Sequence, residues 1–294
     1  MIKFCLLSLL IMLFAFVAHA QGPKKLASLS AEEIIAKHLA SIGTPEAISA
    51  VKSRVFVGQA RLTSRVGFVG QLIGQAQFAS EGDNVLLAVV FNSNDYPYEK
   101  AAFNGKDVSV GRPNGNSTPF GDFIKSNKAI VKEGLFGGVL STAWAPLAKD
   151  SKLKFASAGT AEIGERSYYK VKVSSGSLGD TKVVLFFDAE NFRHVATEYN
   201  QTITVGISKG MKPGPESDLF GTTTTTGMAN QQQTFITFTE RFSDFVKSGE
   251  AVIPMKYVVD YTYKESDTKS LNLEVRFQDV YLNQDLGVEV FKVS

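Results

Sequence analysis

The sequence predicts a mainly β protein with some α-helix, an α+β domain built on an antiparallel sheet of about ten or eleven strands. Apolar residues recur at every second position over most of the chain after residue 53. Helical spacing is confined to the N-terminal part and to a segment near residues 120–131. Strands and helices do not alternate and no fixed-period repeat is present, which excludes a parallel α/β fold and a solenoid.

Residues 1–20 have the pattern of a secretory signal peptide. A short basic segment precedes an apolar run, and Ala18-His19-Ala20 is an A-x-A cleavage motif. We expect cleavage after Ala20, because the apolar run is short for a membrane anchor. The mature chain, residues 21–294, then lacks cysteine, since the single Cys5 is removed. An exported chain without cysteine favours the periplasm.

Two helices are expected at the start of the mature chain. Ser30 and Glu33 have the spacing of a capping box, and apolar residues then recur at helical spacing as far as Ile42. Gly43 suits a helix end, and Pro45 suits the first position of a second short helix.

Strands follow from residue 54 onward. The expected strands lie at 54–62, 70–78, 85–91, 100–103, 108–110, near 153, at 168–174, 182–187, 192–203, 257–263 and 271–278. Residues 207–233 are rich in glycine, proline, threonine and glutamine, and they predict a mobile loop.

Motifs for catalysis, cofactors and nucleic acid are missing. The formal net charge of +2 without a basic block gives no reason to expect nucleic acid. His38 and His194 lack metal-ligand spacing, and we expect His38 at the helix surface or boundary. Glu240 and Asp244 are placed at a strand edge and turn, where acid–base catalysis is not indicated. We therefore expect no metal, no cofactor and no catalytic residue.

Four phrases carry a family resemblance. They are LSAEEIIAKHLASIGTPEAISAVKSRVFVGQARL, VVLFFDAENFRHVATEY, FSDFVKSGEAVIPMKYVVDY and VYLNQDLGVEVF, which together span residues 29–291. In this order they resemble the LolA/LolB-like superfamily of periplasmic lipoprotein carriers. The resemblance implies a single domain over residues 21–294, a strongly curved, half-open antiparallel barrel, helices packed on its concave face, and an apolar cavity between them that holds acyl chains.

The segment EGLFGGVLSTAW, residues 133–144, is the most apolar stretch after the N-terminus. Its uncharged run is too short for a membrane span, and its glycines lack the lysine of a phosphate loop. Phe136, Leu140 and Trp144 fall four apart, which predicts one side of a helix. We interpret the segment as a helical plug or lid on the concave face, either closing over a ligand or completing a core.

The function that these observations predict is a non-catalytic periplasmic carrier for a lipid, a lipoprotein acyl group, a lipidated protein or another hydrophobic ligand. The alternative is a cell-envelope scaffold or protein-interaction module with a filled core and an envelope protein as partner. No transmembrane segment is expected after signal cleavage. The predicted apolar lining consists of Leu72, Phe78, Leu87, Val89, Phe91, Phe120, Phe123, Ile124, Leu135, Phe136, Leu140 and Trp144.

Overall fold

The computed structural model describes residues 26–66, 68–145, 152–207, 230–264 and 268–293. Within these ranges the chain forms one 12-stranded sheet, against the ten or eleven strands predicted. The predicted signal peptide lies outside the described residues. The strands are β1 Ser53–Val66, β2 Phe68–Glu81, β3 Asn84–Phe91, β4 Tyr98–Phe103, β5 Val108–Val110, β6 Lys154–Ile163, β7 Arg166–Ser174, β8 Lys182–Asp188, β9 His194–Ile207, β10 Asn230–Ser248, β11 Ala251–Lys264 and β12 Thr268–Leu282.

The sheet is antiparallel and open. Its strand order is β5-β4-β3-β2-β1-β12-β11-β10-β9-β8-β7-β6, so that β5 and β6 form the two edges. Only the β1–β12 pairing joins strands far apart in the sequence, as in Val55 opposite Tyr281. Every other neighbour in the sheet is also a neighbour in the chain, which is the pattern of successive antiparallel hairpins.

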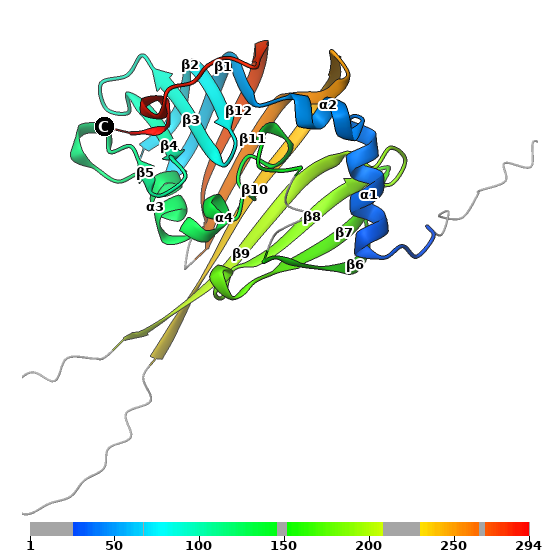
Figure 1. The fold of residues 1–294 in the computed structure, drawn as a ribbon. Coiled ribbons are helices and arrows are strands. Elements are labelled where there is room, and N and C mark those ends of the chain that lie inside the picture. The colour runs from blue at the N-terminus through cyan, green and yellow to red at the C-terminus, as the bar shows by residue number, and fades with distance from the viewer. Residues whose placement is uncertain (1–25, 67, 146–151, 208–229, 265–267, 294) are drawn as a thin grey trace, which may run out of the picture.

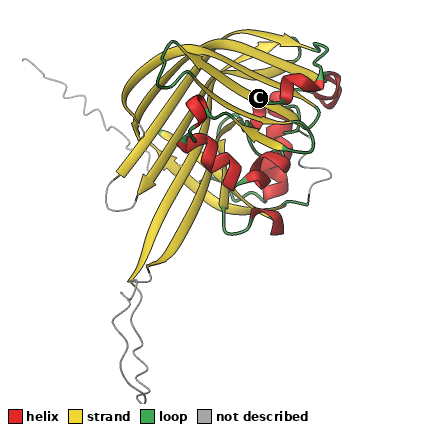
Figure 2. Cartoon of the chain, turned by 90° about the vertical axis from the view of Figure 1, so that its left-hand side faces the viewer, coloured by secondary structure: helices red, strands yellow, loops and turns green. Residues whose placement is uncertain are grey.

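The sheet curls around the helices, as Figures 1 and 2 show. The described residues form the α-helices α1 Ala31–Ile42, α2 Pro45–Ala50, α3 Pro119–Ser126 and α4 Lys128–Lys132. Their apolar residues join the concave-face side chains of the strands in one continuous buried cluster. The predicted curved, half-open sheet with helices on its concave face is therefore confirmed.

Local signals account for the helix starts. In α1, the Ser30 hydroxyl accepts from the Glu33 backbone at 3.2 Å, and the Glu33 carboxylate accepts from the Ser30 backbone at 2.7 Å, completing the predicted capping box. Thr44 caps α2 at Ala47. None of the helices in the described ranges has both the length and the apolar character that crossing a bilayer requires.

The β9–β10 hairpin corrects the predicted boundaries of the loop at 207–233. Ile207 belongs to β9 and residues 230–233 belong to β10, while residues 208–229 lie outside the described part of the chain. The two strands project from the body as a long ribbon (Figure 1). Glutamine and threonine at this end indicate a loop by composition, yet the strand ladder is made by backbone groups whatever the side chains are.

A smaller apolar cluster covers part of the convex face. It contains Val55, Ala79, Leu86 and Ala102 from four adjacent strands, and it is closed by Phe291. Phe291 ends a short 3₁₀ helix, η4 Val288–Phe291, near the C-terminus. The C-terminal segment thus shields the outer face of β1 to β4.

Phe291→Ala tests how much this closure contributes. The side chain is fully buried, so its removal leaves a cavity, and we expect the free energy of unfolding to fall by about 3–5 kcal/mol. Val288→Ala is the control, because Val288 is 53 % exposed and should change stability by less than about 0.5 kcal/mol. Urea unfolding measures both. Equal stability of the two variants would contradict a structural role for Phe291.

Candidate functional site

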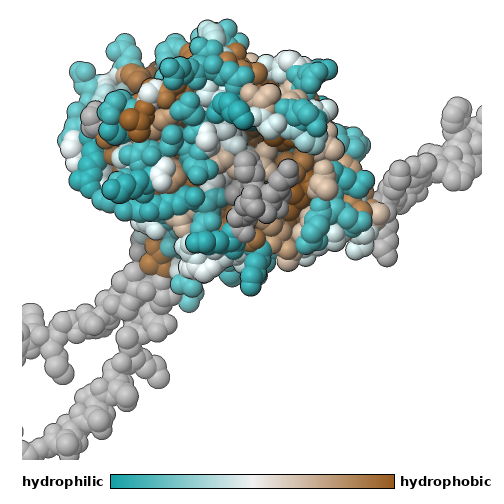
Figure 3. Space-filling view, viewed as in Figure 1, coloured by the Kyte–Doolittle hydropathy of each residue, from teal (hydrophilic) through white to brown (hydrophobic). Residues whose placement is uncertain are grey.

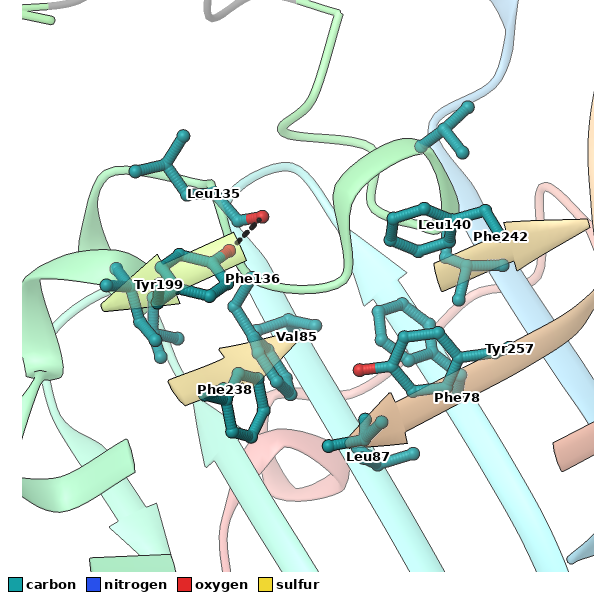
Figure 4. Close-up of a cluster of buried hydrophobic side chains, with 14 of the residues drawn as sticks. Phe78, Val85, Leu87, Leu135, Phe136, Leu140, Tyr199, Phe238, Phe242 and Tyr257 are labelled. Carbon is teal, nitrogen blue, oxygen red and sulfur yellow. Dashed lines mark hydrogen bonds between the residues drawn. The ribbon is translucent and has the colours of Figure 1, made fainter. Parts of the chain in front are cut away.

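The space between the sheet and the helical insertion is filled by side chains. Eleven of the twelve residues predicted as apolar lining are buried in the main core cluster, and Leu72 is partly buried against it. Phe78 and Leu87 of the sheet and Phe136 and Leu140 of the insertion point into this cluster in Figure 4. The structure therefore brings the predicted residues together, and their contact with a ligand stays a prediction.

Residues 133–144 do not form the predicted α-helix. The segment consists of turns on either side of one short 3₁₀ helix, η2 Gly138–Leu140. Gly137 and Gly138 have positive φ values of 77° and 44°, which an α-helix does not accommodate. A Cβ on Gly137 would lie 2.3 Å from Cζ of Phe78, and one on Gly138 would lie 2.7 Å from Cζ of Phe242. The glycines thus allow the backbone to approach the aromatic core, at the expense of helical structure.

Glu240 is the most deeply buried carboxyl group of this core. It lies in the middle of β10 and is fully buried, so its placement at a strand edge was wrong. Its Oε1 accepts from the Tyr257 hydroxyl at 2.6 Å and from the Gly137 backbone N–H at 2.8 Å, and its Oε2 accepts from the Tyr199 hydroxyl at 2.9 Å. Glu240 occupies a core-facing position of β10, between Phe238 and Phe242. An apolar residue is expected at such a position, so the sequence pattern did not predict a buried carboxyl group there.

Burial dominates the ionisation of this group. It raises the pKa of Glu240 to about 7, although the three hydrogen bonds act in the opposite direction. Burial also raises the pKa values of Tyr199 and Tyr257, and the nearby carboxylate adds to both shifts. Both phenols therefore remain protonated donors to Glu240.

Two buried histidines surround Trp144. The indole Nε1 donates to Nε2 of His38 at 2.8 Å, and the indole ring stacks on His194 with centroids 4.2 Å apart. His38 is buried, so its expected place at the helix surface or boundary was wrong. Burial lowers the pKa of His38 to about 4 and that of His194 well below its usual value, which keeps both rings neutral.

An apolar cavity of about 820 Å³ lies beside this cluster, under α1 and α2. Its lining comes from both helices, the first residues of β1, the end of β2 and the end of the 133–144 segment, as Ala36, Leu39, Ala40, Gly43, Pro45, Ile48, Ser49, Val51, Lys52, Arg54, Glu81, Gly82, Thr142 and Ala145. Apolar side chains collect on the face beside α1 in Figure 3. None of the twelve predicted lining residues borders this cavity.

One signal in the sequence bears on the cavity. Ala36 and Ala40 lie four residues apart, on one side of α1, and Gly43 follows the end of that helix. Small residues on a helix face leave space beside it that larger side chains would fill. The capping box and the apolar spacing predict a helix here and do not by themselves predict a cavity.

Arg54 stands at the wall of this cavity. Arg54 lies two residues before Phe56 on β1, and alternate residues of a strand face the same side of the sheet. Arg54 therefore faces the concave side, as Phe56 does. Its Nη1 donates to the Val139 carbonyl at 2.7 Å, whereas its Nε has no hydrogen-bond partner.

Among the described residues, no group of three or more His, Cys, Asp or Glu side chains is arranged to hold a metal ion.

Comparison with known proteins finds solved structures that align with most of this chain. No family model matches it, and no curated protein matches it in sequence. A LolA superfamily protein from Nitrosomonas europaea aligns with a TM-score of 0.45 and 13 % identity, covering 90 % of this chain and 99 % of that one.

Two further solved structures give similar values. A putative outer membrane lipoprotein-sorting protein domain from Vibrio parahaemolyticus has a TM-score of 0.41 and 11 % identity over 89 % of this chain and 95 % of that one. A DUF1329 family protein from Desulfovibrio piger has a TM-score of 0.42 and 7 % identity over 90 % and 98 %. The protein from Nitrosomonas europaea carries in its name the superfamily that the four sequence phrases resemble.

Glu240→Gln tests the buried carboxyl. Because the pKa in the folded state is about 7 against a usual 4.5, the stabilising contribution of Glu240 is complete below pH 4.5 and is lost as the pH rises to about 7. Glutamine keeps the acceptor for Gly137 and donates to Tyr199, whose hydroxyl then turns to the Leu135 carbonyl 3.1 Å away. The variant should therefore gain up to about 3 kcal/mol relative to wild type between pH 4.5 and 8.

Urea unfolding at several pH values measures this difference. Glu250→Gln is the control, because Glu250 is exposed in the turn between β10 and β11. It should reproduce the pH profile of the wild type. Parallel profiles for wild type and Glu240→Gln would contradict titration of Glu240 in this range.

Proposed function

We propose that the mature chain is a periplasmic binding or carrier protein for a lipid, a lipoprotein acyl group or another hydrophobic ligand, and that it catalyses no reaction. The observation that carries this proposal is the apolar cavity of about 820 Å³ under α1 and α2. Its volume lies within the range of about 300–1,000 Å³ that is typical of small-molecule sites. Its walls are mostly aliphatic, with few polar groups, as such sites require.

The hydrophobic effect supplies the affinity for such a ligand. Each methylene group that leaves water for an apolar site contributes about 0.8 kcal/mol, which is roughly fourfold in the dissociation constant. Leu39, Ile48 and Val51 line the cavity and are only partly buried, so they have apolar surface that a ligand could cover. An acyl chain lying against them would bury that surface together with its own.

The role proposed for the twelve core residues follows from their packing. Since eleven of them are buried in the main cluster, they contact a ligand only if the 133–144 segment moves away from the sheet. In the closed arrangement they support the cavity wall from behind. Ala145 borders the cavity and directly follows Trp144, which links the two regions.

The filled interior favours one second candidate, a cell-envelope scaffold or protein-interaction module. In that case the cavity under α1 and α2 would be incidental, and function would depend on outer surfaces. The two candidates differ in one measurable property. A carrier binds lipid saturably, whereas a scaffold does not.

Ala40→Trp tests the carrier proposal directly. Ala40 is exposed on α1 and borders the cavity, so an indole there should occupy ligand space without disturbing the core. We expect the affinity for a fluorescent fatty acid to fall at least about tenfold, since one indole displaces several methylene groups. Ala50→Trp is the matched control, because Ala50 is exposed on α2 and does not border the cavity.

Two results would contradict the carrier proposal. One is delipidated wild-type protein that binds no lipid while mass spectrometry finds none after gentle purification. The other is equal loss of affinity in both tryptophan variants. The first result would favour the scaffold.

Trp144→Ala separates a lid from a core residue. Trp144 is 5 % exposed, donates to His38 and stacks on His194. We therefore expect a loss of about 3–5 kcal/mol in the free energy of unfolding, as for other large-to-small core substitutions, and a smaller change in lipid affinity. Thermal unfolding and lipid titration on the same sample measure both. A large loss of affinity with unchanged stability would instead identify Trp144 as part of a lid.

A further inference from the structure

Arg54 is a buried cation that forms no ion pair with any described residue. Only 6 % of the residue is exposed, and no carboxylate in the described part of the chain lies within ion-pair distance of it. Burial is the cause that lowers the pKa of Arg54 to about 10, with no neighbouring charge contributing. The guanidinium therefore stays charged at neutral pH while losing most of its hydration.

The single hydrogen bond of Arg54 does not explain why an arginine stands there. A guanidinium has five N–H donors in a planar fork, and only Nη1 is bonded, to the Val139 carbonyl at 2.7 Å. Nε is buried and has no partner. Burial of an ionised group is costly unless a charged partner and hydrogen bonds compensate. An anion would supply both the charge and the acceptors that Arg54 lacks within the described part of the chain.

The place of Arg54 decides where that anion would come from. Arg54 borders the apolar cavity, so an anion that occupies this cavity would meet the guanidinium beside aliphatic side chains. Among the described residues, the other charged side chains at the cavity are Lys52, which is exposed, and Glu81, which is partly buried. The described lining thus carries two cations and one carboxylate, a positive balance. A ligand that fits both properties has an acidic head and an apolar tail.

We propose that the cavity binds a single-chain anionic amphiphile, with its acidic head on Arg54 and its tail along Leu39, Ile48 and Val51. This inference rests on the proposed carrier function and specifies its ligand class. Two oxygens of a carboxylate or phosphate match the guanidinium fork, which gives a short, charge-assisted contact. A carboxylate and a phosphate share this chemistry. The test therefore includes one ligand with each head group, a free fatty acid and a lysophosphatidate.

The test compares ligands that differ only in the head. Delipidated wild-type protein is titrated with oleate, oleoyl lysophosphatidate and oleyl alcohol below their micellar concentrations, by displacement of a fluorescent fatty acid analogue. We expect the dissociation constant of the tighter anion to be at least about tenfold lower than that of the alcohol. A hydrogen bond to a charged group, formed away from water, changes a dissociation constant by about this factor. Whichever anion binds better identifies the head group.

Arg54→Met then removes the charge and keeps an apolar side chain of similar length. We expect it to bind all three ligands with affinities within about threefold of one another, close to that of the alcohol for wild type. Lys52→Met is the matched control, since it removes a positive charge from the exposed rim. It should retain most of the preference, because exposed charges are screened by water and salt.

The outcomes separate this inference from the carrier function. Equal binding of alcohol and anions by wild type, or an unchanged preference in Arg54→Met, overturns the inference and leaves the carrier function standing. Binding of none of the three contradicts the carrier function itself. If Arg54→Met does not fold, Arg54→Lys decides. It keeps the charge without the fork, so the preference should fall without vanishing, and an unchanged preference would speak against the fork.

Discussion

The hydrogen bond from the Gly137 backbone to Glu240, 2.8 Å long, fixes the helical insertion to the centre of the sheet. The insertion leaves the sheet after β5 and returns to it at β6, so it joins the two edge strands of an open sheet. Nothing in the strand ladder determines where such a connection lies. A buried carboxyl that also accepts from Tyr199 and Tyr257 provides that position, because an unmade bond in this core would cost more than one in water.

The rest of the 137–144 segment is fixed by contacts of the same kind. The Val139 carbonyl accepts from Arg54 of β1, the Thr142 backbone donates to Ser80 of β2 at 2.9 Å, and the Trp144 indole donates to His38 of α1. At intervals of two or three residues the segment is therefore bonded to a different element. Polar contacts of this type specify one arrangement more than they add net stability. They make the position of α1, and with it the cavity, depend on this short segment.

A similar contact fixes the start of the insertion. Thr118, which caps α3 at Gly121, donates to the buried carboxyl of Glu99 on β4 at 2.7 Å. Burial raises the pKa of Glu99 to about 7, in the same direction as for Glu240. The insertion is thus attached near its start, at Thr118, and again at Gly137, through carboxyl groups that are easier to bury when protonated.

Local patterns predicted what is locally encoded. The period-two alternation of Leu271 to Phe277 placed β12, the pair Ser30 and Glu33 placed the start of α1, and the spacing of Phe120, Phe123 and Ile124 placed α3. These features depend on backbone geometry over a few residues, so a single sequence contains them. Curvature and the concave placement of the helices came from family resemblance, since no periodicity states how far a sheet bends.

The candidate site escaped prediction because its contacts are remote in sequence. Val139 lies 85 residues from Arg54, and Trp144 lies 106 residues from His38, so neither pair leaves a spacing that a motif could capture. Glu240 and Arg54 also break the alternation of their strands, and a charged residue at a core-facing position is most simply interpreted as a strand edge. Such a charged residue can be buried in the core when groups from remote parts of the chain form hydrogen bonds with it. Within the described part of the chain Glu240 accepts three hydrogen bonds, whereas Arg54 donates one, to the Val139 carbonyl, and borders an open apolar space. Both side chains hold the 133–144 segment against the sheet, and of the two only Arg54 also borders the cavity.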